Sequence, residues 1–353
     1  MEMNKPRYWT LRSRSARFHM QLEKRSVRTL AILTMIVIVV SIIGIGIGET
    51  WIHPWEVIRA IFGQSSGAYD FVLYRLRLPR AVVGLLAGAA LGMSGAILQG
   101  MIRNPLASPD IIGITGGASV AAVLFLSYGS SVFHLSIDWL PVAAIMGALI
   151  VSALIYLLSW QNGVTPMRLV LIGIGISAGM SAMTTFMLVI SSTFTASKVY
   201  IWLTGSVYGA TWSGVYSILP VCVVAIPLLL YFARSLNSQE LGDDVALGLG
   251  VRVQKHRLLL LILSVILAGS AVAVVGAVGF VGLIAPHIAR KWVGRTFGSI
   301  SLASGLIGAL LVFVADVIAR TAFYPIDIPA GIFTAAIGAP FFIYLLYQNR
   351  NRF

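Results

Sequence analysis

Long apolar runs alternate with short polar connections along most of the chain. Each run is about twenty residues long, the length of helix that crosses a hydrocarbon layer of about 30 Å. Because every backbone N–H and C=O in hydrocarbon needs a partner within the protein, such runs are expected to be helices. Ten of them cover roughly residues 29–48, 81–101, 109–129, 139–159, 167–191, 214–233, 258–275, 277–296, 300–320 and 329–347. The pattern predicts an all-α, polytopic membrane protein with about ten transmembrane helices.

One further segment, 197–210, is moderately apolar but too short to span a bilayer. It carries Lys198 and two glycines. We expect an interfacial or re-entrant helix here.

The positions of the charges predict the orientation. An even number of spans puts both termini on one side, and the segment before the first run is rich in lysine and arginine. Most of the 25 basic residues fall on that same side, which the positive-inside rule identifies as the cytoplasm. The expected organisation is a basic cytoplasmic segment at 1–28, a transmembrane domain at 29–347 and a cytoplasmic tail at 348–353. The longest polar connection on the cytoplasmic side is 235–256.

Composition agrees with a membrane protein. Of the 353 residues, 58% are hydrophobic and only 10% are charged, and the mean hydropathy is +0.91, which is far more apolar surface than one soluble core needs. No small-residue cleavage site follows the first run, so we expect an uncleaved span rather than a secretory signal. The single cysteine, Cys222, has no partner for a disulfide within the chain.

Residue patterns for catalysis are missing from the sequence. There is no phosphate-binding loop of the form GxxxxGK[ST], no Cys/His zinc spacing and no nucleophile elbow. We therefore expect no enzyme active site, no metal site and no cofactor on this chain. Any ATP hydrolysis that this protein depends on must therefore come from another chain.

Glycine recurs in the second run at Gly84, Gly88, Gly92 and Gly95. A helix face without side chains lets two backbones approach closely. Ordinary packing within the bundle is the simpler interpretation, and lining of a substrate path is the alternative.

Six stretches carry a family resemblance: RLRLPR (75–80), GAALGMSGAILQGMIRNPLASPDIIGITGGA (88–118), LGDDVALGLGV (241–251), VVGAVGFVGLIAPHIAR (274–290), ADVIAR (315–320) and IPAGIFTAAIGAPFFIYLL (328–346). In order and spacing they resemble the iron-siderophore and cobalamin permeases of ABC importers, the FecCD-type transmembrane subunits. The resemblance implies a type II ABC importer permease fold. It also implies a second permease subunit, two cytoplasmic ATPases that hold ATP and Mg²⁺, and an extracytoplasmic binding protein.

The resemblance assigns the stretch beginning at Leu241 to ATPase coupling. In the family, this connection folds into short helices that dock on the ATPase. Asp243 and Asp244 favour a helix N-terminus, while a solvated hairpin is the alternative. The expected coupling residues are Leu241, Gly242, Asp243, Asp244, Ala246, Leu249 and Gly250.

Arg77, Arg80 and Arg320 match family arginines that pair with acidic residues of the binding protein; we expect less from Arg75. The guanidinium fork suits carboxylates. The alternative is that these arginines extend to phospholipid headgroups. The two turns that close the inner gate in the family correspond here to RNPLASPD (103–110) and NGVTPMR (162–168). By this correspondence the expected gate residues are Asn104, Leu106, Pro166 and Met167.

Two remaining polar residues have structural explanations. His287 is isolated, and Asp316 is followed four residues later by Arg320, a spacing that permits an ion pair on one helix face. A proton-coupled secondary transporter would need more interior carboxylates or broken helices.

The sequence thus predicts the permease subunit of an ATP-driven importer of ferric siderophores in the bacterial cytoplasmic membrane. Cobalamin and haem are alternative cargoes. We expect the second permease to be a related but different chain, with membrane lipid around both and no contact with nucleic acid.

Overall fold

The computed structural model describes residues 8–12, 19–64, 67–129, 134–294 and 296–349. Parts of the predicted N-terminal segment and C-terminal tail, including Lys5, Arg14 and Arg352, lie outside the described residues.

Each predicted apolar run contains one helix, which confirms the all-α membrane fold. These helices are α1 (Lys24–Gly46), α3 (Leu78–Ile102), α4 (Ile114–Leu124), α5 (Leu140–Leu158), α6 (Pro166–Ile190), α8 (Trp212–Gln239), α10 (Val253–Val275), α11 (Val281–Val293), α12 (Phe297–Thr321) and α13 (Ala330–Asn349). Within the described residues, eight helical segments are long and apolar enough to cross a membrane. Each of the ten predicted runs thus corresponds to a helix, but among the described residues only eight segments are full-length candidate spans.

The two short helices are α4, with 11 residues, and α11, with 13. α11 begins late because Gly276 ends α10 at a positive φ of 72° and Phe280 also takes a left-handed conformation, so the connection between them is not helical. α4 begins late because the preceding connection contains Pro105 and Pro109 and forms only the 3₁₀ turn η2 (Pro109–Ile112).

Shorter elements complete the fold. β1 (Tyr8–Arg12) pairs antiparallel with β2 (His19–Glu23) ahead of α1. The others are α2 (Pro54–Ile61), η1 (Phe71–Arg77), η3 (Phe125–Gly129), η4 (Ile137–Trp139), α7 (Thr193–Thr204) and α9 (Asp243–Gly248). α7 confirms a short helix near 197–210 but lies earlier than predicted, because Gly205 at φ 73° ends it. α9 lies in the polar connection, which is shorter than 235–256 because α8 continues to Gln239.

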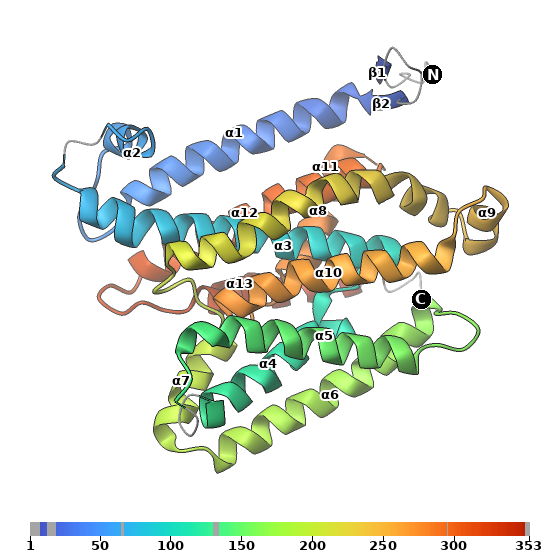
Figure 1. The fold of residues 1–353 in the computed structure, drawn as a ribbon. Coiled ribbons are helices and arrows are strands. Elements are labelled where there is room, and N and C mark those ends of the chain that lie inside the picture. Colours follow the sequence, from blue (N-terminus) through green and yellow to red (C-terminus); the bar gives the residue numbers. More distant parts are fainter. Residues whose placement is uncertain (1–7, 13–18, 65–66, 130–133, 295, 350–353) are drawn as a thin grey trace.

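α3 occupies the centre of the bundle. Figure 1 shows it between α8, α10 and α12, and its most extensive contacts are with α12 and α10. Every side chain from Ala90 to Ile102 is buried. A second group, α4 with α5 and α6, packs beside α10 through α5. α9 and the start of α1 lie at one end of the bundle, here called the α9 end, while α2 and α7 lie at the other, the α2 end.

The glycine face of α3 lies against backbone. A Cβ at Gly88 would collide with the carbonyl of Gly308 on α12, and one at Gly92 with the carbonyl of Ser304. Gly95 lies equally close to Gly282 at the start of α11. The packing interpretation of these glycines is therefore correct for three of the four. Gly84 differs, since a Cβ there would lie 3.8 Å from the nearest atom, a methyl carbon of Val207.

We expect Gly88→Ala to lower the free energy of unfolding by about 1–3 kcal/mol or more, because the added methyl must push α3 away from α12. The apparent melting temperature of the purified chain in detergent measures this. Gly84→Ala is the matched control on the same helix and should leave the melting temperature nearly unchanged. Equal melting of the two variants would contradict the close contact.

Candidate coupling site and the arginine cluster at the opposite end

α9 projects from the bundle and presents an apolar surface. Gly242, at φ 118°, turns the chain into the helix, and Gly250, at φ 80°, turns it out again. Between them only Ala246 is fully buried and Asp244 is exposed. Four large apolar side chains are 48–68% exposed: Leu241, Val245, Leu247 and Leu249. The predicted short helix is confirmed, and its outer surface could pack against another protein.

Asp243, the first residue of α9, faces the bundle instead. One carboxylate oxygen lies 2.9 Å from Nη2 of Arg103, at the end of α3, and the other lies 2.9 Å from Nη2 of Arg257, on α10. The Arg257 side chain is only 2% exposed. Asp243 therefore braces α9 against two helices, in addition to the helix-starting role that the sequence suggested.

The predicted gate residues lie at this same end. The side-chain oxygen of Asn104 accepts a hydrogen bond from the backbone N–H of Leu106 at 2.9 Å, which fixes the turn after α3. Leu106 packs against the buried cluster of Leu283, Ile284 and Leu345. Pro166 opens α6, where its missing N–H costs nothing.

Met167, in the first turn of α6, is 69% exposed. Arg168 on the same turn donates to the carbonyl of Ser159, at the end of α5. The second turn is therefore tied to α5, while its methionine remains available for contact.

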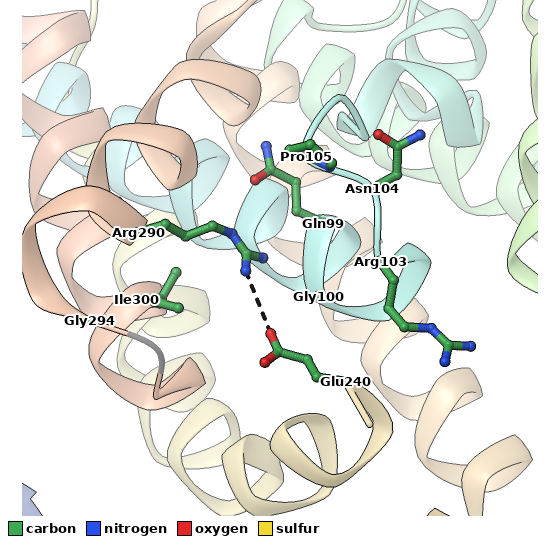
Figure 2. Close-up of a pocket in the computed structure, with 9 residues that line it drawn as sticks. All are labelled: Gln99, Gly100, Arg103, Asn104, Pro105, Glu240, Arg290, Gly294 and Ile300. Carbon is green, nitrogen blue, oxygen red and sulfur yellow. Dashed lines mark ion pairs between the residues drawn. The ribbon is translucent and has the colours of Figure 1, made fainter. Parts of the chain in front are cut away.

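A cavity of about 530 Å³ borders the segment that leads into α9. It is lined by Gln99, Gly100, Arg103, Asn104, Pro105, Glu240, Arg290, Gly294 and Ile300. Figure 2 shows Arg290 and Glu240 facing each other, with 3.5 Å between their nearest charged atoms. The residues before and at the start of α9 are thus held by two ion pairs, Glu240–Arg290 and Asp243–Arg103, at the edge of this cavity.

Arg80 and its carboxylate partners occupy the α2 end. Arg80 Nη2 lies 2.8 Å from the Asp316 carboxylate on α12, and its Nη1 lies 2.7 Å from Asp327, in the connection before α13. Arg320 approaches Asp316 to 3.8 Å and donates to the carbonyls of Gly44 and Ile47. The predicted Asp316–Arg320 pair is confirmed, but the tighter partner is Arg80.

Arg77 also binds the carboxyl end of α1. It donates to the carbonyls of Ile45 and Gly46 at 3.0 Å and to Thr50 at 2.7 Å. The last carbonyls of a helix have no partner within it, so arginines are well suited to satisfy them. Arg77, Arg80 and Arg320 therefore all make internal contacts, and docking of a binding protein on them stays a prediction. Arg75 is exposed.

Sequence reasoning missed Asp327, the Arg80–Asp316 pair and the two partners of Asp243. Arg80 and Asp316 are 236 positions apart, so no local spacing could reveal them. Among the other candidates, Cys222 is buried and free, and the ring of His287 packs edge-on against Phe341. The described residues contain no group of His, Cys, Asp or Glu suited to hold a metal ion.

This helical membrane fold, with the short helix α9 projecting at one end, is that of an ABC importer permease. It is similar to a solved inward-facing conformation of a metal-chelate type ABC transporter, with a TM-score of 0.79 and 31% identity over 92% of this chain and 99% of that one. The chain belongs to the FecCD transport family, whose model matches residues 34–348. It is accordingly a multi-pass transport subunit and not an enzyme.

Named relatives cover almost the whole chain. The Probable siderophore transport system permease protein YfhA of Bacillus subtilis (strain 168) is 48% identical over 93% of this chain and 97% of its own length. The Achromobactin transport system permease protein CbrC of Dickeya dadantii (strain 3937) is 48% identical over 96% of both chains. The Iron(3+)-hydroxamate import system permease protein FhuG of Bacillus subtilis (strain 168) is 40% identical over 90% of this chain and 96% of its own.

We expect Asp316→Asn to lower the free energy of unfolding by about 3–5 kcal/mol, because Arg80 and Arg320 would lose a buried charged partner. Thermal unfolding of the purified chain in lipid nanodiscs checks this. Glu56→Gln, which breaks the exposed Glu56–Arg59 pair on α2, is the control and should cost at most about 1 kcal/mol. A stable Asp316→Asn variant would show that the cluster does not hold the α2 end together.

Proposed function

We propose that this chain is the membrane permease subunit of an ATP-driven importer of ferric siderophores. Membership of the FecCD family gives the class of transporter. The cargo is inferred from relatives at 40–48% identity, whose names concern siderophores or iron chelates. Cobalamin and haem rank behind because none of these three relatives is named for them.

The observation that carries the ATP-driven mechanism is the surface of α9. Leu241, Val245, Leu247 and Leu249 are exposed on the short helix α9 and directly beside its two ends, outside the apolar bundle. Apolar side chains gathered on a surface in water mark a site of protein contact. The sequence contains no phosphate-binding loop, so the partner proposed for this surface is a cytoplasmic ATPase that holds the ATP and Mg²⁺.

Two further partners follow from the proposal. α6 is the least buried of the long apolar helices. It exposes small and hydroxyl-bearing residues that suit a neighbouring protein or a watery passage better than lipid: Gly175, Ala178, Gly179, Ser181, Ala182 and Thr185. A second permease subunit, a related but different chain, would face α6. An extracytoplasmic siderophore-binding protein would approach the α2 end, near Arg77, Arg80 and Arg320.

The location of the protein follows the same reasoning. The α9 end is proposed to face the cytoplasm of a bacterium and the α2 end the outside, with both chain termini cytoplasmic. The basic residues at the start of α1, Lys24, Arg25 and Arg28, lie at the α9 end and fit this orientation.

Proton-coupled transport is a weaker explanation. Among the described residues, Asp316 is the carboxylate buried within a long span, and its oxygens are engaged by Arg80 and approached by Arg320. A carboxylate held this way braces helices instead of exchanging protons with a passage. The chain is proposed to bind no cofactor of its own.

Uptake of radio-iron tests the proposal. Cells with and without this chain would be given iron as a siderophore chelate of hydroxamate or carboxylate type, and labelled cobalamin in parallel. Loss of uptake of an iron chelate alone supports the proposal. Loss of cobalamin uptake alone, with iron uptake unchanged, would overturn the cargo.

We expect Leu247→Asp to reduce co-purification of the ATPase with this chain, and the rate of chelate uptake, at least tenfold, because it places a charge in an apolar contact. Leu247→Met keeps the apolar surface and serves as the control, with little change expected. Affinity purification through a tag on this chain, followed by uptake assays, gives both readouts. Full assembly of the Leu247→Asp variant would exclude the α9 surface as the contact.

A further inference from the structure

Asp243 lies at the junction of three parts of the molecule. It begins α9, and its two carboxylate oxygens bind different arginines, Arg103 and Arg257, at 2.9 Å each. Each arginine in turn reaches one of the two turns at the α9 end that carry the predicted gate residues. A single side chain on the coupling helix is thus connected to both turns.

The first connection runs through Arg103. Arg103 ends α3 in a left-handed conformation, with φ 56°, and its Nη1 also donates to the carbonyl of Gln239 at the end of α8. The next residue in the chain is Asn104, whose side chain fixes the turn by accepting from Leu106. A displacement of Asp243 therefore pulls on Arg103, the first residue of the first turn.

The second connection runs through Arg257. Its Nη1 donates to the carbonyl of Val164, two residues before Pro166. Gln254, one helical turn earlier on α10, accepts from the N–H of the same Val164 at 3.0 Å. Val164 is fully buried, and both its N–H and its C=O bind side chains of α10. The second turn is therefore held against α10 at this residue.

From this geometry we infer that Asp243 is the positioning residue that transmits movement of the coupling helix to both gate turns at once. The inference rests on the proposed function, since it concerns how the ATPase acts on this chain. Both oxygens of Asp243 are engaged by arginines of this chain, while the exposed Leu241, Val245, Leu247 and Leu249 form the surface proposed for the ATPase.

The charges of Asp243, Arg103 and Arg257 strengthen the contacts between α9 and the two turns. One carboxylate separates two guanidinium groups, and charged hydrogen bonds of this kind are shorter and stronger than neutral ones. Without the carboxylate, the two arginines would face each other with like charge, and the buried Arg257 would lose its carboxylate partner. α9 could then move without moving the turns.

The test uses the complete importer, purified through a tag on this chain and placed in liposomes with its binding protein. For each variant, ATP hydrolysis and chelate uptake are measured together, and the ratio of chelate transported per ATP is compared with the wild type. Asp243→Asn removes the charge at both connections. Arg103→Gln removes one connection only, and Glu56→Gln on α2 is the charge-matched control away from the site.

For Asp243→Asn we expect an assembled complex, ATP hydrolysis within about twofold of wild type and at least a tenfold loss in chelate per ATP. Arg103→Gln should show a smaller loss, Arg103→Lys should restore part of it, and Glu56→Gln should match the wild type. An unchanged ratio in Asp243→Asn overturns the inference. If that variant fails to assemble, an unchanged ratio in Arg103→Gln overturns it instead. A wild-type importer that hydrolyses ATP but moves no iron chelate counts against the proposed function, not against this inference.

A distance measurement tests the connection directly. Spin labels on cysteines introduced at the exposed positions Val245 and Met167 report the spread of distances between α9 and the second turn. Cys222, which is buried, stays unlabelled. We expect a narrow distribution in wild type and a clearly broader one in Asp243→Asn, and equal widths would overturn the inference.

Discussion

The close backbone contact between α3 and α12 is the constraint on which the rest of the structure depends. In lipid, helices gain little from burying apolar side chains against one another, so association relies on van der Waals contact and on paired polar groups. Glycines at 88, 92 and 308 bring the two backbones together. Asp316 on α12 can then reach Arg80 on α3, and an ion pair forms where an unpaired charge would be costly.

Arginines at both ends of α3 make contacts with other elements. At the α2 end, Arg77 and Arg80 hold the end of α1, α12 and the connection before α13. At the α9 end, Arg103 holds α9 and the end of α8. The same helix is therefore in contact with the surface proposed for the binding protein and with the surface proposed for the ATPase. Its side chains from Ala90 to Ile102 are all buried within the protein.

The sequence was sufficient for the features that depend on local pattern. Apolar runs of helical length located all ten helices, the glycine spacing identified a packing face, and the spacing of Asp316 and Arg320 indicated their pair. It could not show where helices stop short, because glycines such as Gly276 break a run that hydropathy alone continues. Nor could it show the partners of Asp243 or Arg80, since those contacts join residues far apart in the chain. The exposed Leu241, Leu247 and Leu249 and the arginine-bound Asp243 lie within one short motif, and only the folded structure shows their different surroundings.

The length of the central helical segment has a consequence for how the chain sits in its membrane. η1 and α3 form one continuous helical stretch of 32 residues, Phe71–Ile102, which at 1.5 Å per residue is roughly 48 Å long. A hydrocarbon layer is about 30 Å thick, so an upright helix of this length extends about 9 Å beyond it on either side. Its terminal arginines then reach the depth of the headgroups or water, and tilting of the helix would draw them inward. In the upright orientation both ends protrude, so the span that is most buried within the protein also reaches the two aqueous phases.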